Sequence, residues 1–116
     1  MDIHNYPPID YTPLFEKGKN FAVHCETEEE AEHFIARMIC DHSERSSSWT
    51  LGETRYERYR ENTCYNPRLN TSSNGMSYCS LRYYKENGFT IIPFRDLLIS
   101  YVDIIESDQS IELLIR

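Results

Sequence analysis

The sequence predicts an α+β fold: a mostly antiparallel sheet with one main helix, about residues 28–40, packed on one face, and one or two short helices. Three observations support it. Short apolar runs typical of strands recur between turn residues. One longer segment has apolar residues at helical spacing. The two element types are mixed without the strict alternation of a parallel sheet. With 116 residues, the chain has the length of a single domain.

The first 18 residues are expected to form an extended, proline-rich arm. Proline restricts φ and lacks a backbone donor, so Pro7, Pro8 and Pro13 disfavour a helix or an inner strand. The predicted anchors of this arm on the domain are Ile9, Tyr11, Leu14 and Phe15. The predicted core then spans residues 19–98, and residues 99–116 form the C-terminal segment.

Residues 20–25 are predicted to form a strand, and the main helix follows it. Thr27 and Glu30 have the spacing of a capping box. In this motif the threonine hydroxyl accepts a hydrogen bond from a free backbone amide of the first turn, and the glutamate side chain reaches back to the start of the helix. The run 28–30 of three glutamates suits the positive end of a helix dipole, a reading favoured over metal or acid–base chemistry. The predicted buried stripe of the helix consists of Ala31, Phe34, Ile35, Met38 and Ile39.

The middle of the chain is predicted to be mainly β. A strand is favoured for residues 49–60, with one helical turn over 55–60 as the alternative. A second strand is expected at 62–66, and a turn at 70–75 contains Asn74-Gly75, which suits the positive φ angles of a hairpin. Residues 76–79 are the expected partner strand.

Ser80 is placed to cap a short helix over 81–87, and Gly88 is placed to end it in the left-handed conformation. A strand over 89–92, closed by Pro93, and helical turns over 94–99 should follow. Residues 101–106 and 111–115 are rich in Ile, Val and Leu, and they predict either two strands in a hairpin or one continuous terminal helix.

The sequence favours neither catalysis nor a bound cofactor or metal. It has no nucleophile elbow, zinc-protease motif or glycine-rich phosphate loop. His24 and Cys25 are adjacent on a predicted strand and so point to opposite faces. The four cysteines, Cys25, Cys40, Cys64 and Cys79, include no Cys-x-x-Cys pair; a zinc site using Cys25, Cys40, His24 or His42 is the less favoured alternative. We therefore predict a protein that is not an enzyme.

Arginines and aromatic residues are concentrated between residues 44 and 85. This window has seven basic and four acidic residues, net +3, whereas the rest of the chain has five basic and fifteen acidic residues, net −10. Guanidinium groups bind phosphate and aromatic rings stack on bases. The predicted ligand-binding residues are Trp49, Arg55, Tyr56, Arg58, Tyr59, Arg60, Tyr65 and Arg82. The competing interpretation is that the tyrosines are ordinary strand residues and the arginines merely solvated.

Four segments resemble small proteins encoded by prophages and mobile elements of Gram-positive bacteria: 21–31 (FAVHCETEEEA), 62–65 (NTCY), 78–80 (YCS) and 84–94 (YKENGFTIIPF). The resemblance covers roughly residues 19–98 and carries no catalytic motif. It implies phage counter-defence of the anti-CRISPR or nucleotide-sponge type. The expected protein sequesters a nucleotide or cyclic-nucleotide immune signal without cleaving it.

The ligand site is expected at an interface of a homodimer or higher homo-oligomer, because a small domain offers few deep pockets. The chain has no apolar run or leader pattern, which predicts a cytoplasmic protein of the bacterial host cell without a membrane partner. One alternative is an anti-CRISPR inhibitor that binds a Cas effector through an acidic face formed by residues 26–32 together with Asp103, Glu106, Asp108 and Glu112. A small nucleotide hydrolase is the second alternative.

Overall fold

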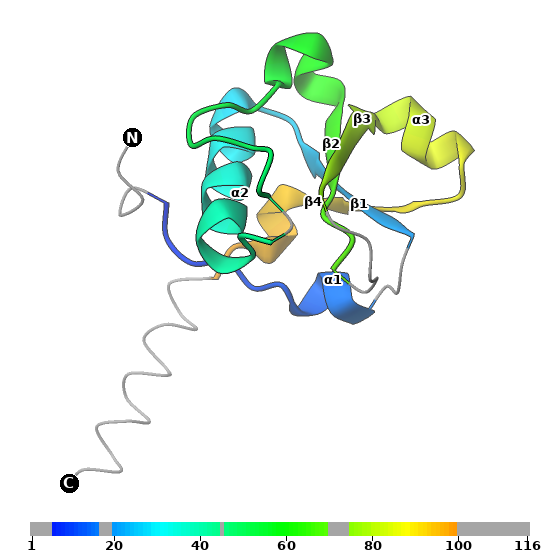
Figure 1. The fold of residues 1–116 in the computed structure, drawn as a ribbon. Coiled ribbons are helices and arrows are strands. Elements are labelled where there is room, and N and C mark those ends of the chain that lie inside the picture. Colours follow the sequence, from blue (N-terminus) through cyan, green and yellow to red (C-terminus); the bar gives the residue numbers. More distant parts are fainter. Residues whose placement is uncertain (1–5, 17–19, 45, 70–74, 100–116) are drawn as a thin grey trace, which may run out of the picture.

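The fold is built on one four-stranded sheet. A computed structural model describes residues 6–16, 20–44, 46–69 and 75–99 (Figure 1). The strands are β1 (Phe21–Cys25), β2 (Thr63–Asn66), β3 (Ser77–Ser80) and β4 (Thr90–Pro93), in the spatial order β3-β2-β1-β4. The β1–β2 and β2–β3 pairs are antiparallel, whereas β4 runs parallel to β1. The sheet is therefore mixed, and the predicted α+β class is confirmed.

The main helix, α2 (Glu28–Asp41), covers one face of the sheet (Figure 1). Thr27 caps it, because its hydroxyl accepts a hydrogen bond from the Glu30 amide at 3.1 Å. The Glu30 carboxylate accepts from the amide of Glu26, one residue before the expected position, at 2.8 Å. Four residues of the predicted stripe are buried, and the fifth, Ile39, is partly buried against the same core.

The two faces of the sheet have separate cores. Alternate β1 residues Phe21, Val23 and Cys25 join the larger core beneath α2. Ala22 points the other way and packs with Cys64 and Tyr84, the latter on the short helix α3 (Leu81–Glu86). Thus α3 lies over the face of the sheet opposite α2 (Figure 1).

Both predicted boundary signals of α3 are present. The Ser80 hydroxyl accepts from the Tyr83 amide at 3.2 Å, which satisfies one of the donors left free in the first turn. Gly88 has a φ of 78°, the left-handed conformation expected just past a helix end. The helix itself is one residue shorter than predicted.

The N-terminal segment is predicted to be extended, but part of it is helical. Residues Thr12–Glu16 form the short helix α1. Pro13 is tolerated there because it lies in the first turn, where its missing N–H has no helical partner. Ile9 and Leu14 are buried anchors, and Ile9 forms an isolated β-bridge with Leu98. Tyr11 packs against the core but Phe15, also predicted as an anchor, is 47% exposed.

The strand expected over residues 49–60 is wrong. The segment consists of turns followed by two 3₁₀ turns, η2 (Tyr56–Arg58) and η3 (Arg60–Asn62). Arg55 and Arg60 have φ angles of 57° and 51°, in the left-handed region, which a strand cannot contain. The Thr54 hydroxyl also accepts from the Tyr56 amide, a local bond that competes with strand pairing.

Some of the remaining expectations are confirmed, and the others concern segments that lie outside the described residues. The β2–β3 pairing and β4 agree with the predicted strands, and η4 (Phe94–Leu97) is the helical turn expected after Pro93. Gly75 has the positive φ, 88°, of the predicted turn, whose residues 70–74 lie outside the described residues. So do the segments 101–106 and 111–115. Among the helices described, none combines the length and apolar character needed to cross a membrane.

Candidate functional site

Two of the predicted stacking residues belong to the core. Trp49 is only 4% exposed, and Tyr65 is fully buried between Phe34 and Trp49, at ring-centroid distances of 5.7 and 5.8 Å. The Tyr65 hydroxyl donates to the Thr54 carbonyl. Burial raises the pKa of Tyr65 above its usual range. Neither ring offers a free face for a base in this arrangement.

Arg55 stabilises the loop that carries it. Its guanidinium carbon lies 3.8 Å from the Trp49 ring centroid and 5.3 Å from that of Tyr78. Its Nε donates to Glu53 Oε1 at 3.0 Å. Because the guanidinium group already has an aromatic and an acidic partner, phosphate binding would have to compete with both.

Tyr56 lies in acidic surroundings. Its hydroxyl donates to the Glu26 carbonyl at 2.7 Å. Desolvation raises the pKa of Tyr56, and the carboxylates of Glu61, Glu28 and Glu30 raise it further. These negative charges oppose the binding of an anion at this ring.

Arg58 and Tyr59 lie beside β3. The Arg58 guanidinium is 5.6 Å from the Tyr59 ring centroid, and Tyr59 meets Tyr78 edge to face at 5.9 Å. The Tyr59 hydroxyl is 3.8 Å from the thiol sulfur of Cys79. The Arg60 side chain is exposed and forms no hydrogen bond or ion pair with another described residue.

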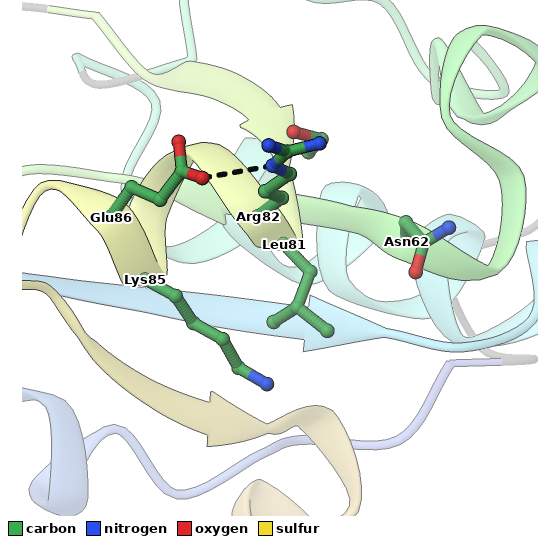
Figure 2. Close-up of a pocket in the computed structure, with 6 residues that line it drawn as sticks. Asn62, Leu81, Arg82, Lys85 and Glu86 are labelled. Carbon is green, nitrogen blue, oxygen red and sulfur yellow. Dashed lines mark hydrogen bonds and ion pairs between the residues drawn. The ribbon is translucent and has the colours of Figure 1, made fainter.

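Arg82 lies in a different place, at a cavity beside α3. This cavity, which we call the α3 hollow, has a volume of about 510 Å³ and is lined by Asn62, Ser80, Leu81, Arg82, Lys85 and Glu86 (Figure 2). The pairing of Thr63 with Ser80 brings the start of β2 to the end of β3, which places Asn62 close to α3. The predicted arginines therefore do not form one site, and only Arg82 reaches this hollow.

The α3 hollow combines two cations with two neutral donors. Arg82 donates to Glu86 at 2.8 Å, but their side chains are 83% and 61% exposed, so the ion pair is weak. Lys85 forms no ion pair with any described residue. Lys85 and Leu81 leave the helix on one side, and Arg82 and Glu86 on the other (Figure 2). The Ser80 hydroxyl accepts from Tyr83, which leaves its own proton for a ligand.

Lys85 extends toward the sheet beneath α3. Burial raises the pKa of the Cys64 thiol to about 12, and the nearby Lys85 ammonium group limits that rise. The Lys85 ammonium group and the Arg82 guanidinium group therefore line the hollow from opposite sides of α3 (Figure 2).

A second cavity, of about 350 Å³, lies at the opposite end of the β2–β3 pair. It is lined by Asn66, Arg68, Ser77, Tyr78, Cys79, Tyr83, Tyr84 and Phe89. Most of its polar groups have partners: Ser77 and Tyr84 share a hydrogen bond of 2.9 Å, and Asn66 Oδ1 accepts from the Arg68 amide. The cavity is more aromatic and less basic than the α3 hollow.

Sequence reasoning missed Asn62 and Ser80 as candidate binding residues. Ser80 was assigned only to capping, and Asn62 only to the start of a strand. The available signal was the predicted pairing of residues 62–66 with 76–79, which brings the two side chains to one end of a hairpin. Lys85 belongs to the predicted basic window but is not among the predicted ligand-binding residues.

The zinc alternative is not supported by the geometry. All of its proposed ligands are described, and no group of three or more His, Cys, Asp or Glu residues in the described ranges is arranged to hold a metal ion. His24 instead makes a 2.7 Å hydrogen bond between Nε2 and the Glu61 carbonyl.

Comparisons of the chain with protein-family models, with curated proteins and with solved structures found no match.

Proposed function

We propose that this protein binds a phosphate-bearing nucleotide signal in the α3 hollow and sequesters it without cleavage, as a phage counter-defence protein. The observation that carries the proposal is Lys85, a cation without an ionic partner among the described residues, in a hollow that also presents Arg82 and Ser80. A volume of about 510 Å³ lies within the usual range, roughly 300–1,000 Å³, for small-molecule sites.

The chemistry of the lining favours an anion. Lysine provides a point charge, and arginine a planar fork that matches phosphate oxygens. A phosphate can displace the Glu86 carboxylate from Arg82, because that exposed ion pair contributes little. Asn62 and Ser80 supply neutral donors for the remaining oxygens.

The same lining supports retention of the ligand rather than hydrolysis. Hydrolysis of a phosphate ester needs a positioned base or nucleophile. The Ser80 oxygen already accepts the Tyr83 amide, and no histidine among the described residues lines the hollow to activate the Ser80 hydroxyl. The bacterial host cell and the immune signal belong to the proposal through the sequence resemblance. The homo-oligomer belongs to it because a small domain offers few deep pockets.

Equilibrium retention tests this proposal. The full chain is incubated with a mixture of linear and cyclic nucleotides and filtered, and the free and heat-released fractions are analysed by mass spectrometry. We expect one nucleotide to be depleted from the filtrate and recovered intact after denaturation. Lys85→Ala combined with Arg82→Ala should weaken its binding by at least about tenfold, since hydrogen bonds to charged groups contribute roughly 1.5–3 kcal/mol.

Arg95→Ala is the matched control. Arg95 is also an exposed arginine with a single ion pair, to Glu26 at 3.0 Å, but it lies away from the hollow lining. Equal affinity in the double variant and the control would refute the site. A nucleotide that disappears and yields product would refute sequestration and favour the hydrolase alternative.

A second candidate function has its own observation. Glu28 in the first turn of α2 and Glu61 in η3 are exposed, and their carboxylates help raise the pKa of Tyr56. The backbone carbonyl of Glu26, another exposed glutamate, accepts a hydrogen bond from the Tyr56 hydroxyl. Such an acidic surface is suited to a basic nucleic-acid channel of a Cas effector. If this alternative holds, Glu28→Lys with Glu61→Lys abolishes capture of the effector, whereas Lys85→Ala with Arg82→Ala leaves it unchanged.

A further inference from the structure

Two of the four cysteines face each other across the β2–β3 pair. Cys64 on β2 and Cys79 on β3 are direct partners in the antiparallel register, between the pairs Thr63–Ser80 and Tyr65–Tyr78. Residues directly opposite on such a pair point to the same face. Both side chains accordingly belong to the smaller core beneath α3. Both are free thiols.

The register places the Cβ atoms of the two cysteines close to the separation that a disulfide needs. Directly opposite residues have Cβ atoms about 4.5–5.5 Å apart, and a disulfide needs about 3.5–4.5 Å, so a small local movement is sufficient. The other cysteines are badly placed for this reaction. Cys25 faces the larger core on the opposite side of the sheet, and Cys40 is exposed on α2.

Cys79 is also accessible to a small reagent. It is only partly buried, and it lines the second cavity, of about 350 Å³. Its sulfur already has a polar neighbour, the Tyr59 hydroxyl, at 3.8 Å. Cys64, in contrast, is fully buried. An oxidant entering from solvent therefore meets Cys79 first and Cys64 second.

We propose that Cys64 and Cys79 form a cross-strand dithiol, and that a low-molecular-weight disulfide such as oxidised glutathione oxidises this dithiol to an intramolecular disulfide bond. The Cys79 thiolate attacks one sulfur of the reagent and expels the other as a thiolate, which takes up a proton. The Cys64 sulfur then attacks Cys79, loses its proton, and expels the second small thiol. Two protein thiols are oxidised, and one reagent disulfide is reduced to two thiols.

The order of attack agrees with the environment of each sulfur. Burial and the neighbouring Cys79 raise the pKa of Cys64 to about 12, whereas Lys85 favours its thiolate. Because only the thiolate is an effective nucleophile, Cys64 is better suited to the second, intramolecular step than to the first. This inference does not depend on the proposed ligand of the α3 hollow.

Oxidation of the full chain with oxidised glutathione tests the proposal. A Cys40→Ser background removes the exposed thiol that would cross-link two molecules. After free thiols are alkylated, the protein is digested without reductant and its peptides are mapped by mass spectrometry. We expect one cross-linked pair joining the peptides of Cys64 and Cys79, lighter by two hydrogen atoms, which a dithiol reductant restores.

Two further variants separate the steps. In Cys64→Ser the resolving thiol is gone, so Cys79 should accumulate the glutathione adduct; in Cys79→Ser neither adduct nor cross-link should form. Circular dichroism confirms that each variant is folded, and Cys79→Ser, at the less buried position, is the safer of the two. A stable glutathione adduct on Cys79 while Cys64 is intact, a cross-link through Cys25, or persistence of both thiols would overturn the proposal.

Discussion

Tyr65 places a hydroxyl in the middle of the larger core. Its ring packs between Phe34 and Trp49, and its hydroxyl donates to the carbonyl of Thr54, in the loop that was expected to be a strand. This hydrogen bond connects β2 to the loop. The residue therefore contributes to stability and to loop conformation rather than to ligand stacking.

Tyr65→Phe should lower the free energy of unfolding by about 1–3 kcal/mol, because the Thr54 carbonyl is left without its buried donor. Urea unfolding followed by circular dichroism measures the change. Tyr83→Phe is the control, since that ring is 48% exposed, and it should alter stability little. An unchanged unfolding midpoint for Tyr65→Phe would show that the hydroxyl does not stabilise the loop.

Among the arginines, position in the chain does not determine role. Arg55 packs on Trp49 and pairs with Glu53, whereas Arg82 lines a hollow with a weak partner. Both side chains are the same chemical group in the same basic window. The difference arises because one guanidinium group is placed on aromatic rings of the core and the other on the outside of a short helix.

At the scale of the element, α2 depends on its first turn. Thr27→Ala removes the hydroxyl that accepts from the Glu30 amide, and should lower the free energy of unfolding by about 1 kcal/mol. Thr27→Ser retains a capping hydroxyl and should stay close to the wild type. The measurement is the urea midpoint at constant slope. Equal loss in both variants would assign the effect to the threonine methyl group instead of the cap.

The stability of helix α3 depends on tertiary packing more than on its cap. With six residues, it is too short to be stable alone, and its position relies on Tyr84, which is buried against Ala22 and Cys64. Its exposed side carries Arg82 and Glu86. The same helix thus presents the cations of the α3 hollow and covers the cross-strand cysteines, although the two proposals are tested by separate measurements.

At the scale of the whole molecule, a buried tyrosine hydroxyl and a buried cysteine thiol should make the folded state less stable at alkaline pH. Burial raises the pKa of Tyr84 from 10.0 to about 12 and that of Cys64 from 9.0 to about 12. Below about pH 8 both groups are protonated in the folded and unfolded chain, so their contribution is fully present. As the pH rises toward 12, the unfolded chain loses these protons first, and stability falls.

The expected result is a urea midpoint that is constant near about pH 8 and declines above about pH 9. Tyr84→Phe should reduce the slope of that decline between about pH 10 and 12, because one of the shifted groups is gone. Tyr83→Phe, at the exposed neighbouring ring, should leave the slope unchanged. A decline of equal slope in the Tyr84 variant would show that this hydroxyl does not contribute to it.

Much of the element layout could be predicted because its signals are local. The Thr27 cap, the apolar stripe of α2, the Ser80 cap and Gly88 each act within a few residues, and all four are confirmed. The errors fall where longer-range contacts decide. The conformation of the loop over 49–60 depends on the burial of Trp49 and Thr54 in the core. The helix at 12–16 buries Leu14 and follows the buried anchor Ile9.

By itself, the sequence determined the α+β class, the starts of α2 and α3, and the separation of a basic window from acidic flanks, since these depend on neighbouring residues and on composition. Only the tertiary structure decided which aromatic residues are buried, that Asn62, Ser80, Arg82 and Lys85 line one hollow, and that Cys64 faces Cys79. Convergence of this kind depends on strand register and on packing between distant segments, which spacing along the chain does not encode.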